Sequence, residues 1–458
     1  MSDARLNDVR PRLFGTDGIR APFGEHPLDQ PTVVGLGRAL GRTLAADGDS
    51  PLVVLGGDTR DSTATLVGWL AAGLASTGAR LEHLDTIPTP GVAWAVRALR
   101  GSAGISISAS HNPWPDNGIK LFDADGRKWS PAAELALERA LEGAADLAPD
   151  ELRSRVVPVD RAGHEAYVAF LTGLFARPDA LAGLSVVLDT ANGATHDIAP
   201  RVFAAHGAQV RRLPGTPDGR NINLGCGSTH PEALAAAVVE SGADLGVAFD
   251  GDGDRALLVD AAGEVRDGDA MLYLWARALF AEGHLDPPAI VATSMSNLGL
   301  EHALAASGIA VVRCDVGDRA VMETMRERGI LLGGEQSGHL VHAPTTSTGD
   351  GLVTGLALAH VVARAGRPLA ELLSGFRRFP QILRNVRVRE KRPFADIPAV
   401  AAAQAAVEAE LAGSGRLVLR YSGTEPLARI MLEGPVLAVI EGQAARLEEA
   451  IRGAVGSG

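Results

Sequence analysis

Short runs of apolar and β-branched residues recur along the chain, and each run ends in a polar turn that leads into a stretch with helical spacing. Three of these runs cover residues 52–55, 185–188 and 289–293. Runs of this length and composition, alternating with helices, predict the strands of parallel α/β sheets. Since the three runs lie far apart in the sequence, they indicate three related α/β units rather than a solenoid of short repeats.

The last part of the chain has a different pattern. An Ala-rich segment at residues 399–411 predicts a helix, and residues 416–420 and 428–433 predict two strands around a Ser-Gly-Thr-Glu-Pro turn. Residues 436–452 predict a closing helix. We therefore expect an α/β protein of three related α/β domains and a smaller C-terminal α+β domain. The expected boundaries give domains at residues 1–162, 163–262, 263–376 and 377–458.

The composition is that of a globular protein with several domains. The chain has 458 residues, of which 46% are hydrophobic and 21% charged. Since a domain usually takes about 100–150 residues, this length fits three or four of them. The net charge of -12 argues against nucleic acid or a membrane surface as a partner, because both need a basic footprint. A small anionic substrate stays compatible, since a local group of arginines and lysines can attract it.

The sequence also indicates the compartment. Cys226 and Cys314 form no C-x-x-C pair, and a single disulfide could not staple a chain of this size, so we expect free thiols in a reducing cytoplasm. Residues 1–12 are polar and lack the apolar core of a signal peptide. The apolar stretch at residues 351–363 is too short to cross a bilayer.

A candidate nucleophile lies in the first third of the chain. Ser106 and Ser108 alternate with isoleucines as in a strand, and Ser110 follows just past the strand end, before Asn112-Pro113. We expect an exposed serine held by rigid structure, which suits a nucleophile. Because turn serines usually cap backbone amides, the alternative is a purely structural residue. The segment does not match the G-x-S-x-G elbow of hydrolases, and Lys120 follows as a nearby cation.

A candidate metal loop follows the apolar run at residues 245–249. Asp250, Asp252 and Asp254 alternate with glycines, so that three carboxylates can converge on a hard cation such as Mg²⁺. An EF-hand is excluded, because its sixth position should be Gly and is Arg255, and its twelfth should be Glu and is Ala261. A solvated acidic turn is the alternative, but buried strands on both sides favour a metal site. A phosphate on Ser110 could supply a further ligand.

Two later loops carry polar groups suited to a sugar phosphate. Arg420-Tyr-Ser-Gly-Thr-Glu-Pro426, followed by Arg429, offers guanidinium groups, hydroxyls and a glycine turn to an anion. Gly333-Gly-Glu-Gln-Ser-Gly-His339 offers a carboxylate, an amide and a hydroxyl to sugar hydroxyls. Each could instead be an ordinary polar turn, and the first does not match a P-loop.

Together these segments resemble the α-D-phosphohexomutase superfamily. The match comprises Phe14-Gly-Thr-Asp-Gly-Ile-Arg20, the Ser110 loop, the triple-aspartate loop, the Gly-Glu-Gln-Ser-Gly-His loop and the Ser-Gly-Thr-Glu-Pro turn, in the order of the family. The resemblance implies four domains around a central cleft, with a mobile fourth domain. It also implies one Mg²⁺ ion per active site.

The resemblance assigns a role to each candidate residue. The catalytic group that it implies consists of Ser110 as the phosphoserine, with Lys120, His111 and Arg20 around the reacting phosphate. The Mg²⁺ ligands that it implies are Ser110, Asp250, Asp252 and Asp254. The substrate-binding residues that it implies are Arg255, Glu335, Ser337, His339, Arg420, Ser422, Gly423, Thr424 and Arg429. Lys120 and His111 are the acid and base candidates.

The form of the Gly334-Glu-Gln-Ser-Gly338 motif, with Asn221-Ile-Asn223, resembles the branch that interconverts glucosamine 6-phosphate and glucosamine 1-phosphate. That branch passes through glucosamine 1,6-bisphosphate, also its primer, and feeds UDP-N-acetylglucosamine and cell-wall precursor synthesis. Its members are often homodimers. The mannose and glucose phosphate branches, a hydrolase and a non-catalytic sugar-phosphate sensor are the alternatives.

Overall fold

The computed structural model describes residues 13–15, 17–45, 50–142, 153–213, 215–422 and 425–456. The segment 1–12, for which the sequence predicts no signal peptide, lies outside these ranges, as do Gly423 and Thr424 of the C-terminal turn. The chain divides into two compact units. The larger unit combines Met1–Met295 with Val311–Leu373, and the smaller combines Ser296–Ala310 with Ser374–Gly458.

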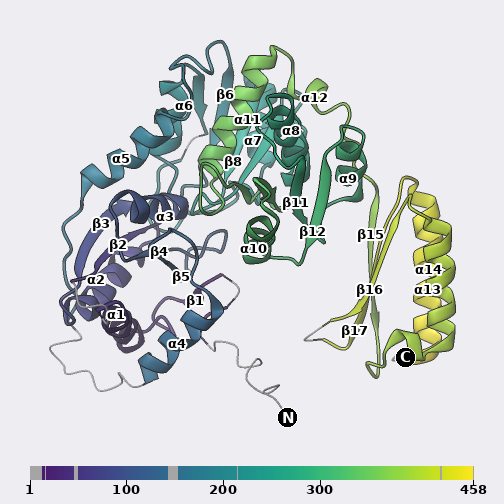
Figure 1. Ribbon diagram of the computed structural model, residues 1–458, viewed down its shortest axis with the longest axis horizontal. Helices are drawn as coiled ribbons and strands as arrows, with labels where there is room; N and C mark the ends of the chain where they lie inside the picture. Colours follow the sequence, from purple (N-terminus) through teal and green to yellow (C-terminus); the bar gives the residue numbers. More distant parts are fainter. Residues whose placement is uncertain are drawn as a thin grey trace. The chain divides into compact units, whose positions relative to one another are not determined.

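The first sheet of the larger unit has the strand order β1-β5-β4-β2-β3 (Figure 1). Its strands are β1 (Ile19–Pro22), β2 (Leu52–Gly57), β3 (Arg80–Thr86), β4 (Ala103–Ile107) and β5 (Asp116–Phe122). Its helices are α1 (Gln30–Ala45), α2 (Thr63–Ala75), α3 (Thr89–Ala98) and α4 (Pro131–Glu142). Helices α1 and α2 approach so closely that a Cβ atom on Gly73 would lie 2.0 Å from the carbonyl oxygen of Val34.

The second sheet has the order β10-β9-β8-β6-β7, with the same sequence of parallel and antiparallel neighbours but an edge strand that comes last rather than first in the chain. Its strands are β6 (Ser185–Asp189), β7 (Gln209–Arg212), β8 (Leu245–Phe249), β9 (Ala256–Asp260) and β10 (Val265–Arg266). The helices of this part are α5 (Arg161–Thr172), α6 (Ile198–Ala205) and α7 (Glu232–Ser241). The five residues of β8 and the five of β9 are all buried, which fixes the turn between these strands at the edge of a core.

The third sheet has the order β12-β11-β13-β14. Its strands are β11 (Ala289–Thr293), β12 (Ala310–Cys314), β13 (Leu332–Gly334) and β14 (Leu340–His342). The helices of this part are α8 (Gly268–Ala281), α10 (Asp318–Arg328), α11 (Gly351–Ala365) and α12 (Leu369–Leu372). Val291, Val321, Met325 and Val341 form its apolar core with neighbouring residues.

The strands expected at residues 52–55, 185–188 and 289–293 are β2, β6 and β11, and the α/β class is confirmed. The parallel pairing expected for these three strands is present, and each sheet of the larger unit also contains antiparallel pairs. The reason lies in three short connections, β4 to β5, β8 to β9 and β13 to β14. Neighbouring strands joined by a short loop run antiparallel, since a parallel connection needs a crossover of a dozen or more residues. These three loops contain Ser110, the three aspartates and Glu335.

The smaller unit contains the antiparallel sheet β15-β17-β16. Its elements are α9 (Leu298–Ala305), β15 (Gln381–Arg387), the short 3-10 helix η1 (Phe394–Asp396), α13 (Pro398–Leu411), β16 (Arg416–Tyr421), β17 (Leu427–Glu433) and α14 (Leu437–Val455). Helices α13 and α14 pack together on one face of this sheet (Figure 1). This is the small α+β domain that the tail of the sequence predicts. None of the described helices, in either unit, is both long and apolar enough to cross a membrane.

A buried hydrogen bond ties α5 to the start of α11. The hydroxyl of Tyr167 donates to a carboxylate oxygen of Asp350 at 2.8 Å, and the same carboxylate accepts the backbone N–H of Val353 as an N-cap. Both side chains are buried. Burial raises the pKa of Asp350 to about 6, although these hydrogen bonds act in the opposite direction.

The raised pKa of Asp350 predicts how stability changes with pH. Because the folded protein holds this proton more tightly than the unfolded chain, its contribution to stability falls as the pH rises from about 4 through about 6. Asp350→Asn removes the charge, keeps one oxygen for the N–H of Val353 and places an amide NH2 against the Tyr167 hydroxyl, which can accept from it. We compare the free energy of unfolding of the variant with that of the wild type by urea unfolding. We expect this difference to shift in favour of the variant by about 1–3 kcal/mol from pH 4 to pH 7.5. A stability difference that is the same at both pH values would contradict the prediction.

Candidate active site

Ser110 lies in the loop between β4 and β5 and is fully buried, so the expectation of an exposed serine is wrong. Its backbone has a φ of 52°, in the left-handed region that few residues other than glycine adopt. Its N–H donates to the hydroxyl of Ser108 at 2.9 Å, and its own hydroxyl donates to Asp250 at 2.6 Å. Ser110 is buried because the loop that contains Asp250 and Gly251 packs against it.

Arg60 holds the Ser110 loop by its backbone. Its guanidinium group donates to the carbonyl oxygens of Ser110 (3.1 Å), Asn112 (2.8 Å), Pro113 (2.5 Å) and Asp116 (2.8 Å). Asp58, at the end of β2, orients the guanidinium by accepting from its Nε atom at 2.8 Å, and Ser108 also donates to this carboxylate. One buried arginine therefore fixes the loop that presents the nucleophile.

The second sheet contributes to the same loop through Asn223. The side-chain amide of Asn223 donates to the carbonyl oxygens of Ser110 at 2.8 Å and Asn112 at 3.1 Å. The aspartate loop also approaches closely: a Cβ atom on Gly251 would lie 2.5 Å from the carbonyl oxygen of Ser110. Only glycine leaves room for the two loops to touch at this position.

Asp250, Asp252 and Asp254 lie together in the turn between β8 and β9. All three are buried, and each offers a carboxylate oxygen within 4.8 Å of the others. Burial raises the pKa of Asp250 well above its ordinary range, and the charges of Asp254 and Asp252 add to this effect. Burial also opposes ionisation of Asp254, but Lys120 and His339 outweigh it and hold its pKa well below the ordinary value.

Lys120 on β5 is the cation that faces these carboxylates. Its ammonium group lies 2.8 Å from Asp252, 3.3 Å from Asp254 and 3.0 Å from Asp17. Burial alone would lower the pKa of Lys120, yet Asp17, Asp252 and Asp254 outweigh burial and raise it well above its ordinary value. The side chain therefore stays protonated and places a positive charge beside the three carboxylates.

The donor set suits a divalent metal ion. Within the described part of the chain, one carboxylate oxygen of Asp252 and one of Asp254 are buried without a hydrogen-bond partner. Leaving such atoms unpaired is costly, whereas a hard cation would satisfy both. The three aspartates thus fit a small oxygen-binding ion such as Mg²⁺.

His111 lies beside the Ser110 hydroxyl, and the charges of Arg20 and Arg255 act on His111. The Nδ1 atom of His111 lies 3.3 Å from this hydroxyl, and burial, followed by the charges of Arg255 and Arg20, lowers its pKa. Arg20 on β1 pairs with Asp17 and donates to the side chain of Asn112 at 3.4 Å. The Nε atom of Arg255 lies 3.8 Å from Asp254. The predicted catalytic residues therefore lie together with the aspartate loop.

The sequence places Glu335, Ser337 and His339 of the Gly-rich loop between β13 and β14 at this site. Only His339 lies against the aspartate turn. The ring of His339 is buried, with Nδ1 3.7 Å from Asp254, and its Nε2 atom accepts the N–H of Gly349 at 3.2 Å. Glu335 is half-buried and accepts the N–H of Gly317 at 3.1 Å, whereas Ser337 is exposed. The side-chain amide of Gln336 donates to Asp267 and Asp269 at 3.3 Å each and not to the aspartates of the β8–β9 turn.

The predicted phosphate turn belongs to the smaller unit. Arg420 on β16 and Arg429 on β17 are direct partners in the strand register, so their side chains start from neighbouring backbone positions. Arg429 pairs with Glu425 at 3.0 Å, and the hydroxyl of Ser422 accepts the N–H of Glu425 at 3.4 Å. Gly423 and Thr424, predicted to bind the same phosphate, lie outside the described residues.

Several residues at this site escape the sequence analysis. They are Asp17, Asp58, Arg60, Asn223 and Lys128. Asp58 follows an expected strand and Asn223 lies in a quoted motif, so both positions carried a signal. Their partners Ser108 and Ser110 are 50 and 113 residues away along the chain. Lys128 pairs with both Asp17 and Asp318 and so connects the first and third sheets of the larger unit.

Four family models cover most of the chain. They describe the three alpha/beta/alpha domains and the C-terminal domain of phosphoglucomutase/phosphomannomutase, matched at residues 11–147, 165–263, 267–379 and 383–450. Among similar proteins, the phosphoglucosamine mutase of Alkalilimnicola ehrlichii is 46% identical, over 98% of each chain. The phosphoglucosamine mutase of Anaeromyxobacter dehalogenans is 45% identical, over 96% of this chain and 99% of that one.

Solved structures share the fold. A phosphoglucomutase/phosphomannomutase family protein from Burkholderia thailandensis matches with a TM-score of 0.76 at 25% identity, over 96% of this chain and 97% of that one. N-acetylphosphoglucosamine mutase of Aspergillus fumigatus, in complex with GlcNAc-6P and magnesium, matches with a TM-score of 0.61 at 18% identity, over 97% and 96%. At that identity the second likeness concerns the fold alone.

The contacts of Asn223 generate a stability prediction. Asn223→Asp keeps the shape of the side chain and its tolerance of the left-handed φ of 57°, but the carboxylate cannot donate to the two loop carbonyls. We expect a loss of about 1–3 kcal/mol in the free energy of unfolding, because both carbonyls keep only the donor from Arg60 and a buried carboxylate oxygen would face them. Asn385→Asp, at an exposed position of β15, is the matched control and should change stability by less than about 0.5 kcal/mol. Equal effects of the two substitutions would rule out the role of Asn223.

Proposed function

The chain belongs to the phosphoglucomutase/phosphomannomutase family, and from this premise we propose that it is a phosphoglucosamine mutase, which interconverts glucosamine 6-phosphate and glucosamine 1-phosphate. Relatives of that name align with almost the whole chain. The observation that carries the proposal is the hydrogen bond of 2.6 Å between the Ser110 hydroxyl and Asp250 in a buried triple-aspartate loop. A nucleophile in contact with a metal-binding loop is what phosphoryl transfer requires.

Ser110 is the residue that we propose to carry the phosphoryl group. Phospho-Ser110 would give its phosphoryl group to the free 1-hydroxyl of glucosamine 6-phosphate. The bond from phosphorus to the serine Oγ breaks as a bond to the sugar oxygen forms, and the product is glucosamine 1,6-bisphosphate. The 6-phosphoryl group then returns to Ser110, so that the enzyme is regenerated and glucosamine 1-phosphate leaves.

The protonation states of the neighbouring groups support separate roles for His111 and Lys120. The lowered pKa of His111 keeps its ring neutral near pH 7, so Nδ1 can accept a proton beside the Ser110 oxygen, 3.3 Å away. The raised pKa of Lys120 keeps its ammonium group charged, which stabilises the negative charge on the transferring group. We therefore propose His111 as the base candidate, and Lys120 with Arg20 as electrostatic stabilisers.

We propose Asp250, Asp252 and Asp254 as the ligands of one Mg²⁺ ion, with phospho-Ser110 as a further ligand. The unpaired buried oxygens of Asp252 and Asp254 support this choice of residues. A bound Mg²⁺ ion would neutralise charge on the phosphoryl oxygens. The carboxylates themselves position Lys120 and accept the Ser110 hydroxyl, which orders the site around the reacting atoms.

We assign substrate binding to the remaining predicted residues. Glu335, His339 and Ser337 lie on the Gly-rich loop and would contact the sugar, and Arg255 would contact the phosphoryl group beside the aspartates. In the smaller unit, Arg420, Ser422, Gly423, Thr424 and Arg429 would bind the phosphate that is not transferred. Two arginines on adjacent strands can form paired charged hydrogen bonds with one phosphate group.

The role of Ser110 is tested by a single hydroxyl deletion. Ser110→Ala should reduce the interconversion of glucosamine 6-phosphate and glucosamine 1-phosphate by a factor of 10⁴ or more, on the order of what loss of a nucleophile costs. The intact mass of the wild type should fall by one phosphate on phosphatase treatment, and that of Ser110→Ala should not change. Ser241→Ala is the matched control, because its hydroxyl only caps the end of α7.

Four outcomes would contradict the proposed function. Turnover by Ser110→Ala near the wild-type rate would remove the phosphoserine. A higher kcat/KM on mannose or glucose phosphates would indicate the corresponding mutase. Release of inorganic phosphate in step with turnover would indicate a hydrolase, and a protein that binds glucosamine 6-phosphate without turnover would be a sensor.

The proposed phosphate turn predicts a defect in binding. Arg429→Gln should raise the KM for glucosamine 6-phosphate about tenfold or more, with a smaller effect on kcat, because it removes a contact made in both the ground state and the transition state. Phosphorylation of Ser110, measured by intact mass, should be unchanged. Arg384→Gln, at an exposed position in the same sheet, is the control and should leave KM unchanged. An equal KM for the two variants would remove Arg429 from the site.

A further inference from the structure

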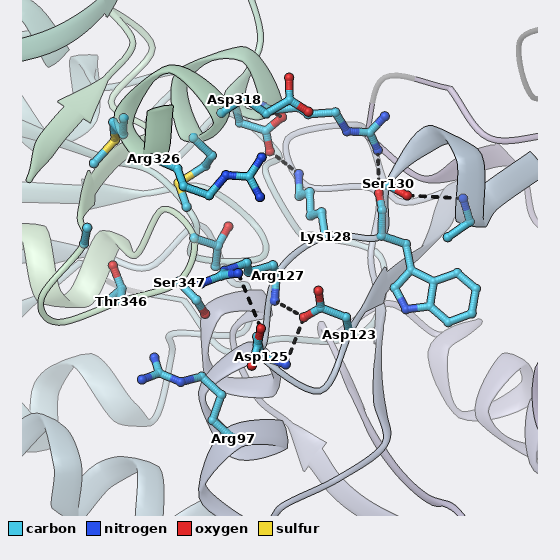
Figure 2. Close-up of a pocket in the computed structure, with 18 of the residues that line it drawn as sticks. Arg97, Asp123, Asp125, Arg127, Lys128, Ser130, Asp318, Arg326, Thr346 and Ser347 are labelled. Carbon is cyan, nitrogen blue, oxygen red and sulfur yellow. Dashed lines mark hydrogen bonds and ion pairs between the residues drawn. The ribbon is translucent and has the colours of Figure 1, made fainter. Parts of the chain in front are cut away.

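The larger unit contains a cavity of about 780 Å³ that takes no part in the proposed reaction (Figure 2). One wall is the turn from Asp123 to Ser130, which connects β5 to α4, together with Arg97 at the end of α3. The opposite wall consists of α10 and the loop from Ala343 to Thr348. Its volume lies in the range of about 300–1,000 Å³ that is typical of small-molecule sites.

The cavity lies away from Ser110 and the aspartate turn, and of the residues described for the candidate active site it is lined by Lys128 and its partner Asp318. Ser102, which lines it, comes just before β4, whereas Ser110 follows β4, so the two residues lie at opposite ends of one strand. Among its lining residues are neither Ser110 nor any of the three aspartates, and the described Gly-rich loop residues Glu335, Ser337 and His339 are also absent. A ligand here would therefore not be a substrate in the act of phosphoryl transfer.

Three arginines give the cavity its chemical character. Arg97, Arg127 and Arg326 come from three different elements, and Figure 2 shows their guanidinium groups on different sides of the same space. Within the described ranges, the side chains of Arg97 and Arg326 have no hydrogen-bond or ion-pair partner. Arg127 has only a long contact of 3.4 Å with Asp125, and both of these side chains are more than half exposed. The positive charge is thus available to a ligand.

Most of the acidic groups in the lining are already engaged. Asp123 accepts the backbone N–H groups of Asp125 and Arg127 at 2.9 Å each, and Asp318 pairs with Lys128. Glu323, an exposed residue on α10, is the lining acid without a partner in the described part of the chain. In a protein with a net charge of -12, unpaired guanidinium groups around one cavity are a focus for anions.

Part of the lining is apolar. Met322, Met325, Ile330 and Leu331 belong to or follow α10, and Leu44 and Ala133 come from the first domain. Such a wall favours a ring or another apolar body, whereas the arginines favour phosphate oxygens, with which they form paired charged hydrogen bonds. A ligand that satisfies both surfaces has an anionic phosphate end and an apolar or ring-containing end.

We infer that this cavity is a second ligand site, which binds a small organic phosphate through Arg97, Arg127 and Arg326. The inference goes beyond the proposed function and does not depend on it, because it concerns binding and needs no turnover. ADP is a suitable probe, since it combines a diphosphate with a planar ring and is not a hexose phosphate.

Isothermal titration calorimetry of the full-length protein with ADP, with and without saturating glucosamine 6-phosphate, tests the inference. We expect binding in both conditions, and a Kd that rises about tenfold or more in Arg97→Gln and in Arg326→Gln, because each loses a charged hydrogen bond. Both arginines are exposed, so these variants should fold normally. Glu323→Gln should lower the Kd, since it removes a negative charge from the lining.

Arg177→Gln is the matched control, because Arg177 is exposed, pairs with Asp179 and does not line the cavity. No heat of binding at millimolar ADP would overturn the inference, as would a Kd that Arg97→Gln and Arg326→Gln leave unchanged. Displacement of ADP by glucosamine 6-phosphate would also overturn it, because the probe would then occupy the substrate site. The mutase assay is separate, so its failure would leave these binding results intact.

Discussion

The burial of three carboxylates in one turn is the constraint on which the rest of the larger unit depends. Asp250, Asp252 and Asp254 repel one another, and burial increases the cost of their charge. The fold offsets this cost with Arg255 of the same turn, with the ammonium group of Lys120 on β5 and with the ring of His339 after β13. Because Lys120 and His339 reach this turn from the first and third sheets, hairpins from three different sheets meet around it.

Much of the fold follows from local pattern, whereas the support of the site does not. The short apolar runs identify β2, β6 and β11, and the tail pattern identifies α13, β16, β17 and α14, because burial of one face leaves a periodic signal. The candidate residues Ser110, Lys120 and the three aspartates were also evident from their spacing. The burial of Ser110 was not, since it results from contact with Gly251 and Asn223, far along the chain. Arg60 acts on backbone carbonyls, which have no sequence signature.

Gln336 lies in the motif that resembles the glucosamine phosphate branch, but its own contacts are with the start of α8. The motif that contains it distinguishes branches of the superfamily, yet its amide faces Asp267 and Asp269 at the start of α8 rather than the aspartate loop. These contacts fix the backbone between Glu335 and His339. In this chain the residue therefore shapes the loop that presents its neighbours, in the same way that Arg60 shapes the loop of Ser110.

The ion pairs around Asp17 join residues that are synthesised at very different times. Its carboxylate pairs with Lys120 and Lys128, and Lys128 also pairs with Asp318 at the start of α10. A ribosome makes these residues in that order, so the N-terminal segment emerges long before its last indirect partner. The ion pair between Lys128 and Asp318 cannot form until most of the polypeptide has been synthesised. A chain that ends before Asp318 would contain Asp17, Lys120 and Lys128 but would lack the second carboxylate that pairs with Lys128.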